Sequence, residues 1–281
     1  MRLQISHETT FSFETPAYYA VQILRLTPRG SSQQFVNDWR ISVSEDCRLT
    51  PVEDPYGNWT HTFSIDGSIE TLSITASGEV MTEETNGVIR GTPERLPISV
   101  YLRRTPATSA EADLRDKAHE ISAASAGEPL ATMHALMGWI SEVIDEDPEP
   151  ATNAPTTDKI LKTLKGNARD RSHLFIAAAR ELEVPTRFVS GYVFDPDKPD
   201  LSRQVHFWAE AFVGHHLGWV GFDPTLDLCP TEGHVRLASS LDYLDALPIR
   251  ATSMGGFGLT TTSKVLVREA AIRTRRHIMA D

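Results

Sequence analysis

The central element of this protein is predicted from residues 166–183, which read GNARDRSHLFIAAARELE. From residue 168 onward this is the most continuously apolar helical pattern in the chain, and Leu174, Phe175 and the alanines after them bury at least one broad face. Three β-rich segments follow, TRFVSGYVF, VHFWAEAFV and GWVGFDPT, linked by turns and a polar loop. A buried helix followed by antiparallel strands predicts an α+β core.

Before this core, residues 1–103 alternate with a period of two. Short runs such as LQISHETTFSF, VQILRLTP and PISVYLRR are rich in Val, Ile, Thr and aromatic residues and are separated by turn residues. Residues 54–58, DPYGN, join two of these runs, and their simplest interpretation is a hairpin turn. The pattern predicts an all-β, sandwich-like N-terminal domain.

Residues 104–250 are expected to form the second domain, which opens with helices. Ser109 can cap a helix that Gly127 closes, an amphipathic helix follows, and a short helix ends at Gly166. The acidic stretch before that short helix is expected to be a solvated loop. Residues 251–281 are expected to return as one strand, TSKVLVREA, and a solvated basic tail, RTRRH.

Composition excludes several classes of protein. The 281 residues suit about two domains at roughly 150 residues each, and a net charge of −11 disfavours binding to nucleic acid. No stretch of 18 apolar residues and no signal peptide is visible, so no membrane contact is expected. Cys47 and Cys229 are the only cysteines, too few for a disulfide scaffold, which indicates a reducing cytoplasm.

Three positions stand out by their context in the predicted core. His206 lies in a predicted strand, Asp223 ends the next strand, and the buried helix begins just after Gly166. At a helix start, unpaired N–H groups and the positive dipole end stabilise a thiolate and then an oxyanion. In a thiol enzyme a histidine accepts the proton and an aspartate orients its ring. The sequence supplies the histidine and the aspartate of such a site.

The segment from Gly166 to Tyr192, with VHFWAE and GWVGFDPT, resembles the transglutaminase-like superfamily, in particular bacterial members with a β-rich N-terminal domain. The likeness extends to the strings HETTF, LRLTP and DPYGN near the start and to DYLDALP late in the chain, so it covers nearly all of it. The resemblance implies a papain-like, cysteine-proteinase-type core, in which a central buried helix packs on an antiparallel sheet and carries a Cys-His-Asp arrangement.

The family pattern at the helix start is Gly-Val-Cys-Gln-Asp-Phe-Ala-His, where this chain reads GNARDRSH. Ala168 therefore stands at the nucleophile position, and His206 and Asp223 match the other two members. A methyl group cannot attack a carbonyl, so covalent catalysis by the family route is excluded at this position. Four further residues of the pattern also differ, which favours natural loss over an engineered replacement.

Other side chains are weaker candidates for a nucleophile. Cys229 lies six residues after Asp223, and Cys47 lies in the β-rich domain, but neither starts a buried helix. Ser172 lies one turn beyond Ala168, deeper along the helix, and serine is a weak nucleophile without a placed base.

Ligand-binding candidates are Arg169 and Trp208. The simpler interpretation of Arg169 and Arg171 is that both are solvated surface residues. The alternative interpretation is that Arg169 binds an anion or a carboxylate. Without a thiolate partner, His206 is either a vestigial imidazole held by Asp223 or a side chain that forms a hydrogen bond with a bound ligand. The core histidines show neither HExxH nor a cysteine-bearing spacing, so no metal or other cofactor is expected.

Three functions remain open. The first is a non-catalytic member, a pseudoenzyme that keeps its cleft for binding a peptide or protein, or as a scaffold. The second is an acyl-transfer enzyme of the cysteine protease or transglutaminase type whose cysteine at position 168 was replaced by alanine. The third is a structural or assembly protein that acts through the β-rich domain. The sequence leaves the substrate, the partner and the oligomeric state open.

Overall fold

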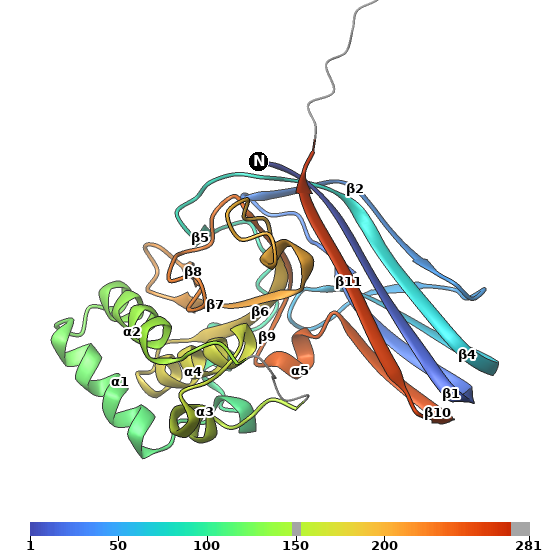
Figure 1. The fold of residues 1–281 in the computed structure, drawn as a ribbon. Coiled ribbons are helices and arrows are strands. Elements are labelled where there is room, and N and C mark those ends of the chain that lie inside the picture. The colour runs from blue at the N-terminus through green and yellow to red at the C-terminus, as the bar shows by residue number, and fades with distance from the viewer. Residues whose placement is uncertain (148–152, 271–281) are drawn as a thin grey trace, which may run out of the picture.

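The computed structural model describes residues 1–147 and 153–270 as an α+β fold built on two antiparallel sheets (Figure 1). The long strands of the first sheet stand on one side of the view, the helices on the other, and the second sheet lies between them. The basic run at residues 273–277 and the end of the acidic stretch lie outside the described residues. None of the described helices is long and apolar enough to span a membrane.

The first sheet has six strands, namely β1 (Arg2–Thr27), β2 (Gln34–Val43), β3 (Thr50–Glu53), β4 (Trp59–Thr82), β10 (Ile249–Phe257) and β11 (Thr260–Glu269). β1 pairs with β4 on one side, and on the other side with β11 through its first half and with β10 through its second half. β2 and β3 pair with the far side of β4. The C-terminal strands therefore complete a sheet that the N-terminal strands begin.

This sheet differs from the sequence prediction in three ways. The segment after residue 250, expected to hold one strand, holds most of β10 and all of β11. The runs LQISHETTFSF and VQILRLTP, expected to be separate strands, are the two halves of β1, because register shifts between Ser12 and Ala17 and between Ala17 and Tyr19 disturb the alternation without ending the strand. The described strands of residues 1–82 form one sheet, not the two stacked sheets of a sandwich.

A second antiparallel sheet packs against the first. It runs in the order β5 (Val88–Ile89), β8 (Trp219–Phe222), β7 (His206–Phe212), β6 (Thr186–Val193) and β9 (His234–Ser240). Tyr192, Val235 and Leu237 from this sheet join the apolar core of the six-stranded sheet. Every residue of β6 is buried, because its other face is covered by the helices.

The helices form the third layer, and they are α1 (Ala112–Ala124), α2 (Pro129–Val143), α3 (Thr157–Thr163), α4 (Ala168–Glu181) and α5 (Tyr243–Ala246). The first four confirm the predicted helices, although the N-cap of α1 is Glu111 in place of Ser109. The run PISVYLRR, expected to be a strand, contains the 3₁₀ helix Ile98–Leu102. β9 and α5 were not predicted.

Helix α4 is anchored at both ends. At its start Asn167 and Asp170 form a capping box, in which each side chain accepts the backbone N–H of the other. Near its end the buried Arg180 donates to the carbonyl oxygens of Tyr101 and Thr186. Because both ends are held, the first residue of α4 has a defined place beside the second sheet.

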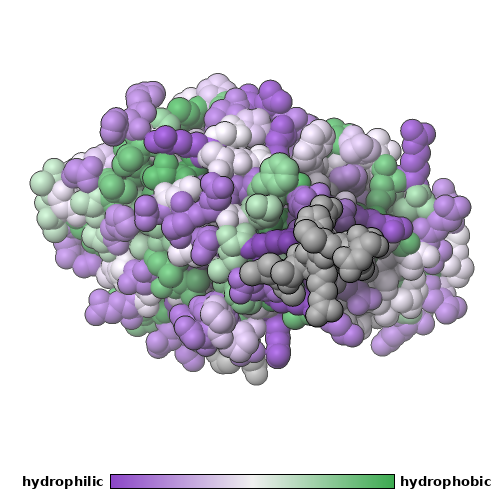
Figure 2. Space-filling model, turned by 90° about the horizontal axis from the view of Figure 1, so that it is seen from above, coloured by the Kyte–Doolittle hydropathy of each residue, from purple (hydrophilic) through white to green (hydrophobic). Residues whose placement is uncertain are grey.

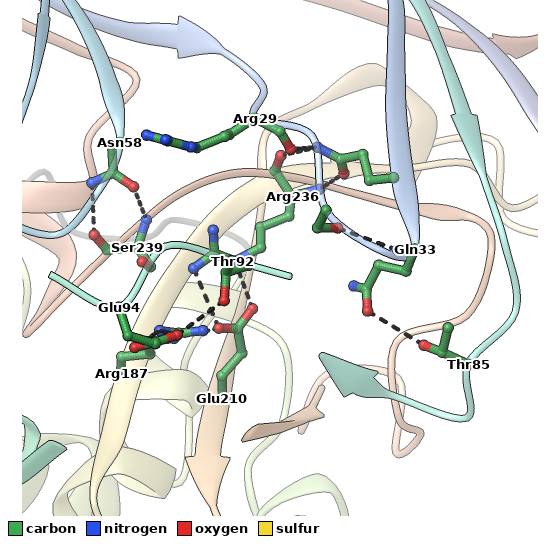
Figure 3. A network of polar contacts seen from close by, with 12 residues as sticks. Arg29, Gln33, Asn58, Thr85, Thr92, Glu94, Arg187, Glu210, Arg236 and Ser239 are labelled. Atoms are coloured by element: carbon green, nitrogen blue, oxygen red, sulfur yellow. Dashed lines mark hydrogen bonds and ion pairs between the residues drawn. The ribbon is translucent and has the colours of Figure 1, made fainter. Parts of the chain in front are cut away.

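A buried ionic network lies across β6, β7 and β9 (Figure 3). Arg187 donates to Glu210 at 2.5 Å and to Glu94 at 3.1 Å, and Arg236 donates to Glu210 at 2.8 Å. Burial opposes both charges, but the two guanidinium groups still lower the pKa of Glu210 below its usual value. The network joins three neighbouring strands on the sheet face away from α4.

On the surface, hydrophilic side chains alternate with smaller hydrophobic patches over the face seen in Figure 2.

Candidate functional site

The histidine and aspartate predicted from the sequence are in direct contact. His206 begins β7 and Asp223 follows β8, and these strands are neighbours in the second sheet. His206 Nε2 lies 2.6 Å from Asp223 Oδ2, and both side chains are buried. Because Nε2 is engaged by the carboxylate, Nδ1 is the ring nitrogen left for the pocket that His206 lines.

Asp223 is held by its own turn. Its Oδ1 accepts the backbone N–H groups of Thr225 at 2.9 Å and Leu226 at 3.3 Å, an arrangement that follows from the sequence DPTL. Burial raises the pKa of this carboxyl group, but the contacts with His206 and His234 outweigh burial, and the net pKa lies well below the ordinary aspartate value. The carboxylate is therefore ionised and orients the ring of His206.

A second histidine, which the sequence analysis did not place at the site, also reaches Asp223. His234 begins β9, and its Nε2 lies 3.3 Å from Asp223 Oδ2. Its Nδ1 accepts the backbone N–H of Thr231 at 3.1 Å, so the neutral ring carries its proton on Nε2 and donates it to Asp223. No spacing in the sequence pointed to this contact, because β9 itself was not predicted.

Ala168 faces the same pocket as His206. It is the first residue of α4, and the pocket has a volume of about 170 Å³. The lining residues come from the segment after α2, the start of α4, the approach to β7 with its first residues, and the turn after β8, and they are Glu146, Asn167, Ala168, Leu201, Gln204, Val205, His206, Phe207 and Thr225. The fold thus brings together the three positions that the sequence singled out, and the first of them carries a methyl group.

The start of α4 also presents a backbone donor to this pocket. Asn167 satisfies the N–H of Asp170, whereas the N–H of Ala168 has no acceptor among the described residues. The first N–H groups of a helix lie at the positive end of its dipole. A carbonyl oxygen bound at the start of α4 can accept this N–H, and His206 lines the same pocket.

The side chains weighed as substitute nucleophiles lie elsewhere or are engaged. Ser172 donates its hydroxyl to the carbonyl oxygen of Ala168 at 2.7 Å and is fully buried. Cys229 packs into the helical core, where burial raises the pKa of its thiol to about 11. Cys47 packs against the core of the six-stranded sheet, and burial raises the pKa of its thiol as well. None of the three lines the pocket of Ala168.

The arginines of α4 are buried, which differs from the solvated positions expected as the simpler alternative. Arg169 donates to Asp170 Oδ1 at 2.8 Å and lies over the ring of Tyr243. Neither Arg169 nor Arg171 is among the residues that line the pocket. A role in ligand binding for Arg169 stays a prediction.

Trp208, the other predicted ligand-binding residue, is a packing residue of the second sheet. Its ring lies against Gly191 on β6, where an added Cβ atom would come within 2.4 Å of the indole. The ring centroid is 6.3 Å from that of His206, but the indole does not line the pocket.

His173 is also an internal residue. Its Nε2 accepts the backbone N–H of Tyr243, and burial lowers the pKa of its ring to about 3.

Comparison with known proteins bears on this arrangement. Residues 115–224 match the family model of the transglutaminase-like superfamily. Residues 3–81 match that of the bacterial transglutaminase-like N-terminal region. The matched core contains Ala168, His206 and Asp223, all three positions of the site.

Individual proteins are similar over nearly the whole chain. An uncharacterized protein of Mycobacterium leprae (strain TN) is 26% identical over 264 residues, which cover 90% of this chain and 94% of that protein. Among solved structures, a candidate cysteine protease from Cytophaga hutchinsonii superposes with a TM-score of 0.69 at 18% identity, covering 95% of this chain and 98% of that one. At this identity, the similarity to the Cytophaga hutchinsonii structure shows a shared fold.

Proposed function

We propose that this chain is a non-catalytic member of the transglutaminase-like superfamily, whose family models match residues 3–81 and 115–224, and that its pocket binds a peptide segment without reacting with it. The observation that carries the proposal is Ala168, the first residue of α4, which lines one pocket with His206. A methyl group has no electron pair with which to attack a carbonyl carbon. Loss of the nucleophile from a cooperating triad costs about 10⁶-fold in rate, or about 8 kcal/mol of barrier.

Binding needs less than catalysis, and the parts that serve binding are present. The N–H of Ala168 can donate to a peptide carbonyl oxygen, and His206, oriented by Asp223, can accept or donate a hydrogen bond through Nδ1. The pocket of about 170 Å³ has room for a small part of a peptide, such as one amide group with a short side chain. The rest of a bound segment would lie along the surface outside it.

A thiol restored at position 168 tests the proposal directly. We expect wild-type protein to show no turnover of peptide amides. We expect the variant Ala168→Cys to be alkylated by iodoacetamide at residue 168 much faster than at Cys47 or Cys229, because the helix start and His206 favour a thiolate there. Mass spectrometry of the labelled peptides gives the three rates. The matched control is Ala168→Cys combined with His206→Ala, which should label slowly.

Two results would contradict the proposal. Amide turnover by wild-type protein that disappears in His206→Ala would show that another group attacks the substrate. Binding is tested separately with fluorescein-labelled peptides and anisotropy. If the bulky variant Ala168→Trp bound every peptide as tightly as wild-type protein, the pocket would not be the binding site.

The intact pair of His206 and Asp223 favours a second candidate, an acyl-transfer enzyme of the thiol type whose cysteine was exchanged for alanine. The same variant separates the two. An Ala168→Cys protein that hydrolyses or transfers a peptide acyl group with steady-state turnover supports the enzyme. An alkylated but inactive variant supports the non-catalytic member, since reactivity then survives without a working substrate site.

A further inference from the structure

The carboxylate of Asp223 is saturated by contacts within the protein. Its Oδ1 accepts the backbone N–H groups of Thr225 at 2.9 Å and of Leu226 at 3.3 Å. Its Oδ2 is shared by two rings, with His206 Nε2 at 2.6 Å and His234 Nε2 at 3.3 Å. A carboxylate has about four lone-pair sites, so these contacts leave none for a water molecule or for another orientation of the group.

The two histidines on this oxygen differ in what their other ring nitrogen meets. The Nδ1 of His206 is left for the pocket that this residue lines. The Nδ1 of His234 lies 3.1 Å from the backbone nitrogen of Thr231 and 3.3 Å from its hydroxyl oxygen. Because an N–H group that points at Nδ1 leaves no place for a proton there, His234 carries its proton on Nε2. His234 is therefore a fixed donor to Asp223, and of the two rings His206 is the one with a nitrogen available to a ligand.

The ring of His234 is oriented by its own turn, which reads TEGH over residues 231–234. The backbone N–H of His234 donates to the carbonyl oxygen of Thr231 at 3.0 Å, and the N–H of Gly233 donates to the Thr231 hydroxyl at 3.2 Å. The partner of Nδ1 thus belongs to the same closed turn as the ring itself. The direction in which Nε2 donates is consequently set by four neighbouring residues.

His234 reaches Asp223 across the width of the second sheet. β9 begins with His234 and β8 precedes Asp223, and the sheet order places β7 and β6 between these two strands. Trp208 of β7 packs against both histidines, with its ring centroid 6.3 Å from that of His206 and 5.5 Å from that of His234. The indole has room because Gly191 on β6 has no side chain there. Packing against one indole restrains both rings that contact the carboxylate.

We propose that His234 is a positioning residue: by donating to Asp223 Oδ2 it fixes the carboxylate that keeps the proton of His206 on Nε2 and leaves Nδ1 to accept a hydrogen bond from a ligand. This role rests on the proposed function, because the nitrogen concerned belongs to the proposed binding pocket. Without the N–H of His234, a buried carboxylate has one vacant acceptor site and gains freedom to rotate or to bind water. The ring of His206 then loses its single tautomer.

Nitrogen-15 NMR of the histidine rings tests this role in the full-length protein without any ligand. Correlations of the ring nitrogens with the carbon-bound ring protons report which nitrogen carries the proton. At about pH 8, above the ordinary titration range of histidine, we expect His206 and His234 each to carry it on Nε2. The signals missing from His206→Gln and His234→Gln assign the two rings. A wild-type His234 that carries its proton on Nδ1, or that populates both tautomers, would overturn the proposal.

Two substitutions at residue 234 separate positioning from packing. His234→Leu fills the site but removes the N–H, and we expect His206 to populate both tautomers in this variant. His234→Gln keeps an N–H donor on its side-chain amide and should retain the single tautomer. The buried ring of His173, whose Nε2 accepts the N–H of Tyr243, is the internal control, because unchanged signals there show an intact core. If His206 kept one tautomer in His234→Leu while His173 was unchanged, the proposal would be wrong.

A labelling experiment connects this role to the pocket. In the Ala168→Cys protein, adding His234→Leu should slow alkylation of residue 168 by iodoacetamide at least about fivefold, whereas adding His234→Gln should change it less than about twofold. If Ala168→Cys alone reacts no faster than Cys229, the proposed function is contradicted, and the tautomer of His206 still decides the role of His234. Fast labelling at residue 168 that is equal with leucine and with glutamine at residue 234 would overturn the positioning role.

Discussion

Asp223 is the residue on which the site's electrostatics converge, since two histidines and two backbone N–H groups contact its carboxylate. Its pKa in the folded protein lies below the value of 3.8 expected in the unfolded chain. The charged form therefore stabilises the fold at every pH above about 3.8, and this stabilisation is lost as the pH falls through the folded-state value.

We predict that Asp223→Asn lowers the free energy of unfolding by about 2 kcal/mol at pH 7. The difference from wild-type protein should shrink as the pH falls below about 3.8, because the carboxyl group of the unfolded wild-type chain then binds a proton that the folded protein does not. Urea unfolding at pH 7 and at about pH 3.5 measures it. Asp158→Asn, at an exposed pair with Lys162, serves as the control and should cost little at either pH. A difference that grew on acidification would refute this account of Asp223.

Ala168 shows at the same scale why a single side chain separates fold from chemistry. The capping box of α4 uses Asn167 and Asp170, and neither contact involves the side chain of residue 168. The helix start therefore forms in the same way with alanine as with cysteine. We infer that the scaffold of the pocket is independent of the group that would have reacted in it.

Among the elements, the turn at residues 54–58 does more than reverse the chain. Gly57 adopts a positive φ of 83°, as the predicted turn requires. Asn58 then reaches β9, where its side-chain amide donates to the carbonyl oxygen of Ser239 and accepts the N–H of Ser239, both at 2.8 Å (Figure 3). The amide of Asn58 thereby forms the two hydrogen bonds with Ser239 that a neighbouring strand would form, and it joins the turn to the second sheet.

We predict that Asn58→Ala costs about 2 to 4 kcal/mol of stability, since it leaves a buried N–H and a buried C=O of Ser239 without partners. Thermal and urea unfolding of the variant would measure the loss. Asn37→Ala removes an exposed hydrogen bond to Glu79 and is the matched control, with an expected change below about 0.5 kcal/mol. Equal effects of the two substitutions would show that Asn58 does not join the two sheets.

For the whole molecule, stability is expected to fall on mild acidification because two histidines are buried as neutral rings. Burial lowers the pKa of His7 to about 4 and that of His173 to about 3, while both have ordinary values of 6.5 in the unfolded chain. Below pH 6.5 the unfolded state therefore binds protons that the folded state does not. Each ring should lower stability by about 1.4 kcal/mol per pH unit between about pH 6 and pH 4.5.

The measurement is the slope of the unfolding free energy against pH. His7→Gln removes one titrating group and should reduce the slope by about 1.4 kcal/mol per pH unit, whatever it costs at pH 7. If His7→Gln kept the full wild-type slope, His7 would not be neutral in the folded protein.

The sequence alone determined the helices and the identity of three site positions. Helical periodicity and capping residues act over a few neighbours, so α1 to α4 could be predicted nearly to their ends. That residue 168 is an alanine and not a cysteine is read directly from the sequence. Family resemblance supplied the expectation that Ala168, His206 and Asp223 meet; in the structure His206 contacts Asp223, and Ala168 and His206 line one pocket.

Only the tertiary structure decided which strands share a sheet and what reaches the site from β9. Alternation reveals that a strand has a buried face, but not which distant strand covers that face or pairs with its edge. β10 and β11 therefore could not be assigned to the N-terminal sheet, nor could His234 be assigned to Asp223. These contacts join segments far apart in the chain, and long-range contacts follow from packing of the whole molecule, which a local pattern does not encode.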